Sequence, residues 1–181
     1  MIIFDTETTG LPRSGLMDLS KQPQIIEFAA IKLDDATLEE VERIEFFANP
    51  GKLLPPKITE ITGIKDLDLV DAEPFANHFN KLCKFWFEQK YSFAHNHSFD
   101  SQMMIFELRR LKKQYKFPWT PVQICTVNAT YSMKGYRLKL QALHEHLFGE
   151  EFKGAHRAMT DVEALTRIVK ELLNRQIIKI I

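Results

Sequence analysis

The stretch IIFDTETTGL, residues 2–11, is the part of the sequence from which the fold can be inferred first. Its apolar start is short enough for a buried strand. Asp5 and Glu7 follow at alternate positions, and alternate side chains of a strand point to the same face. At about 4 Å and an effective dielectric of about 20, two such charges repel by about 4 kcal/mol. A hard divalent cation, which prefers oxygen ligands, would offset that repulsion. The alternative is an edge strand with two solvated acids.

Length and charge set broad limits on the protein. A chain of 181 residues is expected to form one domain, 1–181, that buries about 70% of its unfolded surface. The formal net charge is zero, so the overall charge does not indicate a nucleic-acid partner. Acids are nevertheless concentrated in residues 34–45 and bases in residues 109–116, with Lys134, Arg137 and Lys139 further along. Each run can be a solvated face, and the basic run can also extend a track for a phosphate backbone.

The cysteines and the apolar runs indicate where the protein is found. Cys83 and Cys125 form no C-x-x-C motif, so neither a zinc site nor a disulfide framework is indicated, and both suit a reducing compartment. No signal peptide precedes the first strand, and no apolar run is long enough to span a membrane. We therefore expect a cytoplasmic protein with no membrane partner.

The remaining pattern predicts three strands followed by helices that alternate with short strands. Strands are predicted at 25–33, 38–48, 91–94 and 122–125, and helices at 72–88, 99–111, 138–148 and 158–174, with a helical turn at 55–63, loops at 12–24 and 117–121, and a turn at 34–37. Thr126 could cap a further short helix. The first three strands form an antiparallel meander. The whole predicts a mixed α/β sheet with helices on its faces. Glu27 interrupts the second strand and is either a hydrogen-bonded acid or part of a site rim.

Two further acids lie on the apolar stripes of predicted helices. Asp100 shares its stripe with Met104, Leu108 and Leu111, and Asp161 shares its stripe with Leu165, Ile168, Val169 and Leu172. An acid near a helix N-terminus is either favoured by the helix dipole or a ligand. Together with the strand pair, these acids predict a convergent cluster of four carboxylates. Two divalent ions about 4 Å apart would neutralise such a cluster, and this arrangement supports phosphoryl transfer.

His156 lies five residues before Asp161. On a continuous helix, five residues correspond to a rotation of about 140°, so the two side chains would not share a face. Gly154 indicates that His156 lies in the preceding loop instead, beside the aspartate. A histidine side chain titrates near neutral pH, which suits a general base for water.

Three motifs resemble those of a known family, the DEDDh 3′→5′ exonucleases of the DnaQ-like group. FDTETTGL at residues 4–11 is similar to the first motif, HNHSFD at 95–100 to the second and HRAMTD at 156–161 to the third; ITGI at 61–64 also has the family's look. The similarity covers nearly the whole chain. A histidine five residues before the last aspartate, rather than a tyrosine four before it, indicates the DEDDh branch.

The resemblance implies an RNase H-like fold and an enzyme that releases nucleoside 5′-monophosphates from a nucleic acid with a free 3′ end, expected to be single-stranded DNA. It implies two Mg²⁺ or Mn²⁺ ions bound by Asp5, Glu7, Asp100 and Asp161, with His156 as general base. It further implies substrate contacts by Thr8, Leu11, Asn96 and Phe99, although Leu11 and Phe99 could also be plain core residues. Proofreading subunits often continue past the third motif into a tail that binds the polymerase, whereas this sequence ends at 181, so a polymerase partner stays open.

Two other functions are compatible with the same residues. An endonuclease of this fold also uses four acids, but His156 argues against it. A non-catalytic nucleic-acid-binding module is disfavoured by the complete set of five candidate catalytic residues: Asp5, Glu7, Asp100, His156 and Asp161.

Overall fold

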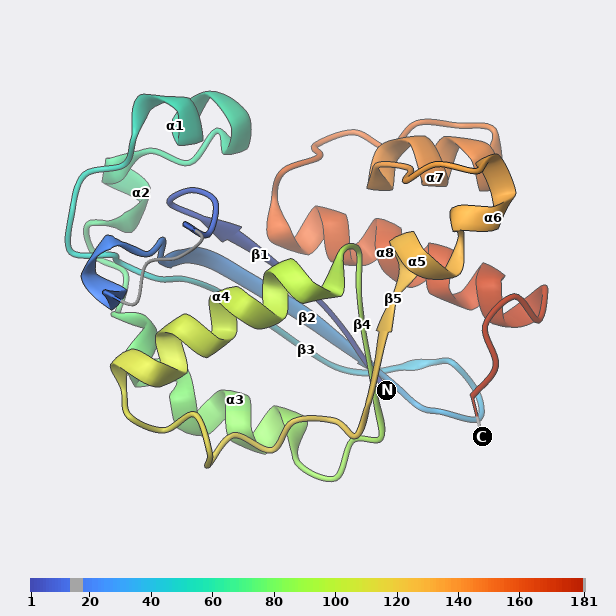
Figure 1. The fold of residues 1–181 in the computed structure, drawn as a ribbon, viewed down its shortest axis with the longest axis horizontal. Coiled ribbons are helices and arrows are strands. Elements are labelled where there is room, and N and C mark those ends of the chain that lie inside the picture. The colour runs from blue at the N-terminus through green and yellow to red at the C-terminus, as the bar shows by residue number, and fades with distance from the viewer. Residues whose placement is uncertain (14–17, 181) are drawn as a thin grey trace.

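In a computed structural model, which describes residues 1–13 and 18–180, the chain is built around a five-stranded sheet in the order β3-β2-β1-β4-β5 (Figure 1). β1 (Ile2–Thr8), β2 (Ile25–Leu33) and β3 (Glu40–Phe47) are antiparallel neighbours. β4 (Tyr91–Ala94) pairs parallel to β1, and β5 (Val122–Cys125) pairs parallel to β4. The predicted meander and the mixed sheet are confirmed.

The side chains of β1 alternate between two cores, which places helices on both faces of the sheet. Ile2 and Phe4 pack against α3 (Phe79–Trp86) and α4 (His97–Arg110). Ile3 packs on the opposite face against α7 (Leu140–Phe148) and α8 (Ala158–Asn174). Asp5 and Glu7 continue the row of Ile3 along the strand. The acid pair is therefore carried by the central strand, on the face that α8 covers.

The predicted helical stripes that carry the two aspartates are buried. Asp100, Met104 and Leu108 are buried along α4, and Asp161, Leu165, Ile168, Val169 and Leu172 are buried along α8. Leu111, the last residue of the predicted stripe with Asp100, is half-buried and lies just after α4 ends. α8 has the bounds predicted from the periodicity, and α7 ends at Gly149, which has a left-handed backbone conformation (φ 72°). A residue without a β-carbon adopts this conformation at no steric cost, so the glycine ends the helix.

The prediction of one continuous helix over residues 72–88 was wrong in its first half. Residues Phe75–His78 form a 3₁₀ turn, η2, and the α-helix begins at Phe79. In this tighter turn the His78 ring stacks flat on Phe46 of β3, with ring centroids 3.7 Å apart. The 3₁₀ turn thus occurs where His78 contacts the sheet, and the spacing of apolar residues alone does not predict it.

Short elements fill the connections between the main ones. They are η1 (Leu19–Lys21), α1 (Pro56–Thr62), α2 (Asp66–Leu69), α5 (Thr126–Ala129) and α6 (Tyr131–Lys134). The sequence predicted α1, did not predict α2, α6 or η1, and placed Thr126 as a cap, whereas it is the first residue of α5. Residues 14–17 of the predicted loop at 12–24, and residue 181, lie outside the described part of the chain. Among the described helices, none has the length and apolar character needed to cross a membrane.

Candidate active site

A cavity of about 350 Å³ lies where the end of β1, the start of α4, the start of α7 and the loop before α8 meet. Its lining residues are Asp5, Thr6, Glu7, His95, Phe99, Asp100, Lys139, Leu140, Gln141, Phe152, Ala155, His156 and Asp161. All five residues predicted to be catalytic therefore face one space, although they come from three distant parts of the sequence.

Asp100 lies next to the acid pair because the pairing of β4 with β1 ends before Asp5. The described pairing of β1 with β4 covers Ile2 and Ile3. Further along β1, the backbone N–H of Thr6 donates instead to Asp100 Oδ1 at 3.1 Å, and the Thr6 hydroxyl donates to the same oxygen at 2.8 Å. The carboxylate thus takes the place of a strand partner and is held next to Asp5.

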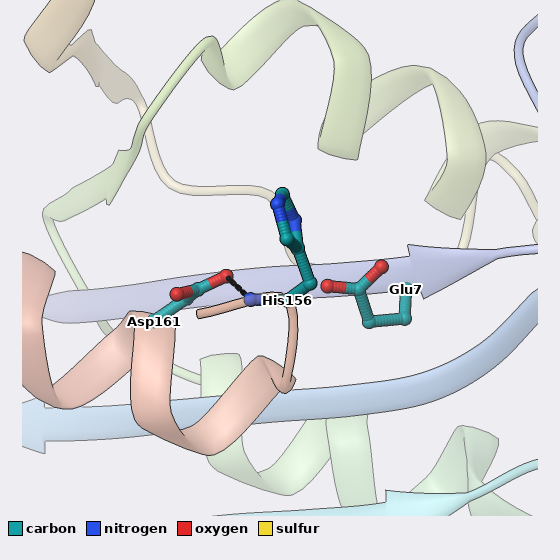
Figure 2. A group of neighbouring side chains, drawn as sticks. All are labelled: Glu7, His156 and Asp161. Carbon is teal, nitrogen blue, oxygen red and sulfur yellow. Dashed lines mark hydrogen bonds between the residues drawn. The ribbon is translucent and has the colours of Figure 1, made fainter. Parts of the chain in front are cut away.

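Asp161 and His156 are joined through the backbone. The N–H of His156 donates to Asp161 Oδ2 at 3.0 Å, and His156 has a left-handed conformation (φ 68°) that is uncommon for residues with a β-carbon. Figure 2 shows His156 between the carboxylates of Glu7 and Asp161. One possible ligand atom from each of these three residues lies within 4.8 Å of the others. The loop position predicted for His156 is confirmed.

The cavity strongly disfavours the charged form of its acids. Burial, followed by the charges of Asp100 and Asp161, raises the pKa of Asp5 well above its usual value. Burial and the charge of Asp161 raise the pKa of Glu7 to about 8. Burial also raises the pKa of Asp100 to about 7, despite the hydrogen bonds from Thr6, and the pKa of Asp161 to about 6, despite the N–H of His156. The protein is therefore poised to bind a positive charge at this site.

The chemistry of these residues fits a divalent metal. Asp161 Oδ1 is buried and has no hydrogen-bond partner among the described residues, although a buried carboxylate oxygen is costly to leave unpaired. It faces a space shared with three other carboxylates, and oxygen donors are the ligands that Mg²⁺ and Mn²⁺ prefer. Asp5, Glu7, Asp100 and Asp161 can thus supply a metal site.

Glu27, whose role the sequence left open, is a buried acid that organises the start of α8. It lies directly across from Glu7 in the pairing of β1 with β2 and is 1% exposed. Its carboxylate accepts hydrogen bonds from Arg157 Nη2 at 2.9 Å and from the backbone N–H of Ala158 at 3.0 Å. Ala158 is the first residue of α8, so Glu27 supplies from β2 the cap that the helix's own N-cap side chain does not.

The four predicted substrate-binding residues do not all line the cavity that holds the acids. Phe99 lines the cavity. Leu11 is 77% exposed, so it is not a core residue, and it lines a second cavity of about 300 Å³ with Thr9, Gly10 and several basic side chains. The Thr8 hydroxyl donates to the carbonyl of Gly10 at 2.8 Å. Asn96 caps α4 in a left-handed conformation, beside the cavity lining rather than within it.

Several lining residues were not predicted. The sequence gives His95 only as part of the motif at 95–100 and Lys139 only as one of several basic residues. It carries no signal that assigns Leu140, Gln141 or Phe152 to the site. Burial lowers the pKa of His95 to about 4, so the ring is neutral at physiological pH. Its Nε2 contacts the Leu138 carbonyl at 3.0 Å and its Nδ1 the Thr126 hydroxyl at 3.0 Å. A carbonyl only accepts, so Nε2–H donates to it and Nδ1 accepts from Thr126.

The basic run at 109–116 includes one residue with a structural role. Arg110 Nη2 donates to the carbonyls of Leu19, Gln22 and Pro23 at 2.9–3.0 Å, and Nη1 donates to Glu107. Arg110 therefore fastens the segment before β2 to the end of α4. Its replacement would disturb the fold, so it is a poor probe of phosphate binding.

Comparisons with known proteins identify relatives of this chain. A model of the RNase_T family, described as exonuclease, matches residues 2–169. The DNA polymerase III PolC-type of Oceanobacillus iheyensis is 33% identical over 181 residues, which cover 97% of this chain and 12% of that protein. The same protein of Bacillus subtilis is 30% identical over 172 residues, which cover 95% of this chain and 11% of that protein. The chain thus spans only a small part of these relatives.

Solved structures share the fold. The nuclease domain of 3′hExo, a DEDDh family member bound to rAMP, has a TM-score of 0.77 at 19% identity and covers 96% of this chain and 91% of that one. Exonuclease X in complex with 5′-overhanging duplex DNA has a TM-score of 0.68 at 21% identity and covers 98% and 93%. The zinc-bound E. coli ExoI–ssDNA complex has a TM-score of 0.78 at 21% identity and covers 97% and 40%. The predicted RNase H-like exonuclease fold is confirmed.

The raised pKa values predict how the stability of the metal-free protein depends on pH. A carboxyl group whose pKa is higher in the folded state binds more protons when folded, so the free energy of unfolding falls as pH rises through that pKa. With pKa values raised to about 8 for Glu7 and about 7 for Asp100, the melting temperature in chelator should fall as the pH rises from about 5 to about 8 and should level off above about pH 8. The buried histidines His95 and His97, with pKa values lowered to about 4, act in the opposite sense between about pH 4 and about pH 6.5, so the fall should be clearest between about pH 6.5 and about pH 8.

Asp100→Asn is the matched control for this pH dependence. It keeps the oxygen that accepts from Thr6 and removes one charge, so the variant should melt at an equal or higher temperature in chelator and show a shallower fall with pH. Added Mg²⁺ should raise the melting temperature of the wild-type protein more than that of the variant. Strong destabilisation of Asp100→Asn in chelator would mean that Asp100 is a structural hydrogen-bond partner rather than a member of a repulsive cluster.

Replacement of Glu27 should destabilise the fold by removing the cap of α8. Glu27→Ala leaves the Ala158 N–H and the Arg157 guanidinium without this acceptor, which should lower the free energy of unfolding by about 1.5–3 kcal/mol. Glu27→Gln keeps an acceptor oxygen and also removes a charge beside the site, so its loss should be clearly smaller. Urea unfolding in chelator measures both variants, and equal stability of Glu27→Ala and wild type would exclude the proposed cap.

Proposed function

This chain belongs to the DnaQ-like exonuclease family, in its DEDDh branch, and on that premise we propose that it removes nucleotides from the 3′ end of single-stranded DNA with the help of two divalent cations. The family resemblance inferred from the three motifs is confirmed, and with it an exonuclease that acts on nucleic-acid 3′ ends. The observation that carries the finer proposal is the convergence of four carboxylates and one histidine on a single cavity.

The four acids are proposed to hold the cations. Enzymes of this family depend on divalent metal, and Mg²⁺ or Mn²⁺ suits an all-oxygen ligand set. Asp5, Glu7, Asp100 and Asp161 would bind them, with Asp161 Oδ1 as the oxygen that has no other described partner. When bound, such ions supply an activated water and stabilise the departing 3′ oxygen of the strand.

His156 is proposed to take the proton of the attacking water. Its loop position leaves the imidazole exposed, and the backbone bond to Asp161 holds the residue beside the acids. The same nearness would allow the ring to act as a metal ligand with Glu7 and Asp161. A general base is the role we propose, because the four carboxylates already supply the oxygen ligands that Mg²⁺ and Mn²⁺ prefer over an imidazole nitrogen.

The terminal nucleotide is proposed to lie over the start of α4 and the end of β1. Phe99 offers an aromatic face inside the cavity, and Leu11 offers an exposed apolar side chain beyond Glu7. Two further substrate contacts are proposed. The backbone near Thr8 would contact the sugar 3′ hydroxyl, and Asn96 would contact the nucleotide from the N-cap of α4.

DNA is the proposed substrate because of the relatives' names. The curated relatives are DNA polymerases, of which this chain matches 11–12% of the length, and solved structures of the same fold include complexes with single-stranded and with 5′-overhanging duplex DNA. The PolC-type names also support a polymerase as a protein partner.

Degradation should proceed from the 3′ end and require a divalent cation. With Mg²⁺ or Mn²⁺, 5′-labelled single-stranded DNA should give a ladder of successively shorter products and nucleoside 5′-monophosphates, because cations held by the acid cluster would bind one phosphate at a strand end. Denaturing gels with Mg²⁺ and with chelator measure this, and parallel lanes of duplex DNA and RNA report substrate preference. Full activity in chelator, cleavage of a circular strand, or cleavage of a strand with a blocked 3′ end would contradict the proposal.

His156 variants should separate a general base from a metal ligand. Loss of a general base should lower kcat by roughly 10²–10⁴ while the affinity for Mn²⁺, measured by calorimetry, stays close to that of wild type. His156→Ala tests this, and His156→Asn is its control for backbone strain, since asparagine tolerates a left-handed conformation. A large drop in metal affinity in both variants would assign His156 as a ligand, and a wild-type rate at neutral pH would remove it from the mechanism.

A further inference from the structure

A basic and aromatic surface lies next to the cavity, formed by Tyr131, Lys134, Tyr136, Arg137 and Lys139 and called here the 131–139 surface. Tyr131 and Tyr136 are 51% and 58% exposed, and the three cations are also exposed. The stretch 108–144 contains no aspartate or glutamate, so no acid of neighbouring sequence offsets these charges. The chain as a whole has no net charge, which makes this concentration of positive charge a local feature.

The 131–139 surface is fastened to the same loop that carries part of the active site. Nε2–H of His95 donates to the Leu138 carbonyl at 3.0 Å, and Arg137 Nη2 donates to Asn96 Oδ1 at 2.9 Å. His95 and Asn96 directly precede α4, which carries Asp100. Leu138 is itself buried. The position of the surface relative to the acids is therefore set by packing and by two hydrogen bonds.

The surface also continues into the cavity wall. Lys139, its last member, lines the cavity together with Leu140 and Gln141. Lys134 and Lys139 can lie at most about 18 Å apart along the chain, which corresponds to about five nucleotides of a stacked strand. A strand whose terminal phosphate lies at the acids can thus pass directly onto these side chains.

Resting on the proposed function, we propose that the 131–139 surface binds the nucleotides on the 5′ side of the scissile phosphate in a single-stranded substrate. Lysine and arginine side chains bind phosphates without regard to sequence, and exposed aromatic rings stack on bases that are not paired. In a duplex the base faces are stacked within the helix, so the two tyrosines select for an unpaired strand. The terminal nucleotide, by contrast, is assigned to Phe99 and Leu11.

Kinetics on substrates of increasing length test this assignment. The substrates are the p-nitrophenyl ester of thymidine 5′-monophosphate, which ends at the reacting phosphate, and oligothymidylates of two to twelve nucleotides. Tyr131→Leu/Tyr136→Leu removes the rings, and Lys134→Gln removes one charge while Arg137, which holds Asn96, stays in place. Lys84→Gln is the matched control, because Lys84 is exposed and lies on α3, which packs on the face of the sheet opposite α7 and α8.

Both surface variants should raise KM for the twelve-nucleotide strand and leave kcat and the hydrolysis of the ester close to wild type. The ring variant should raise KM at least about fivefold for each lost stack. The charge variant should reduce the slope of log KM against log salt concentration by about 0.7, the contribution of one phosphate contact on a single strand. The control variant should match wild type in every measurement.

Three outcomes would overturn the assignment. An unchanged KM for the long strand in both surface variants would exclude nucleotide binding and leave the surface to a protein partner. An equal loss on the ester and on the long strand would mean that the variants damage the acid site. An equal effect of Lys84→Gln would mean that binding follows overall charge. Failure of the proposed function looks different, because wild-type protein would then hydrolyse no substrate of any length.

Discussion

Repulsion among carboxylates that are withdrawn from water is the constraint on which the rest of this structure depends. Asp5, Glu7, Asp100 and Asp161 line one cavity, and Glu27 lies directly across from Glu7. Burial raises the pKa of each of the four lining acids, and neighbouring acids raise them further. Such a cluster persists only where the surrounding fold is stable enough to hold it and where donors are placed against the acids.

The fold supplies those donors at points where regular backbone pairing stops. Thr6 donates its backbone N–H to Asp100 beyond the described pairing of β1 with β4. His156 donates its N–H to Asp161 from the loop before α8, and Ala158 donates its N–H to Glu27 from the first turn of that helix. Backbone N–H groups that would otherwise lack a partner thus donate to buried carboxylates, which would be costly to leave without a hydrogen bond. Strand ends and helix starts therefore determine where the acids lie.

The hydrogen-bond donors are unevenly distributed among the four carboxylates, and this determines where the site favours a positive charge. Asp100 and one oxygen of Asp161 have fixed donors, whereas Asp161 Oδ1 has none among the described residues. Burial and the charge of Asp161 raise the pKa of Glu7 to about 8. Positive charge is thus favoured between β1 and the start of α8. The same loop that leads into Asp100 also holds the 131–139 surface through His95 and Asn96, so the acids and the basic surface are positioned by one segment of the chain.

Much of this protein was determined by its sequence alone. Apolar residues predicted the bounds of β2, β4 and α8, because these elements are buried on at least one face. The bounds of β5 were also predicted, although its residues are exposed or half-buried. Acids on otherwise apolar faces predicted Asp5, Glu7, Asp100 and Asp161 as a cluster, since a charge in such a position requires a partner. The glycine before His156 predicted a loop for that residue.

Only the tertiary structure decided which partners these residues find. Glu27 could have been a rim residue or a buried acceptor, and the choice depended on Arg157 and Ala158, which are 130 and 131 residues away in the sequence. The basic run at 109–116 appeared uniform, yet Arg110 is engaged by three carbonyls before β2. The 131–139 surface lies beside the active site because hydrogen bonds join it to His95 and Asn96. Periodicity is a local property of the chain, whereas hydrogen-bond partners and shared cavities depend on which distant segments the packed sheet brings together.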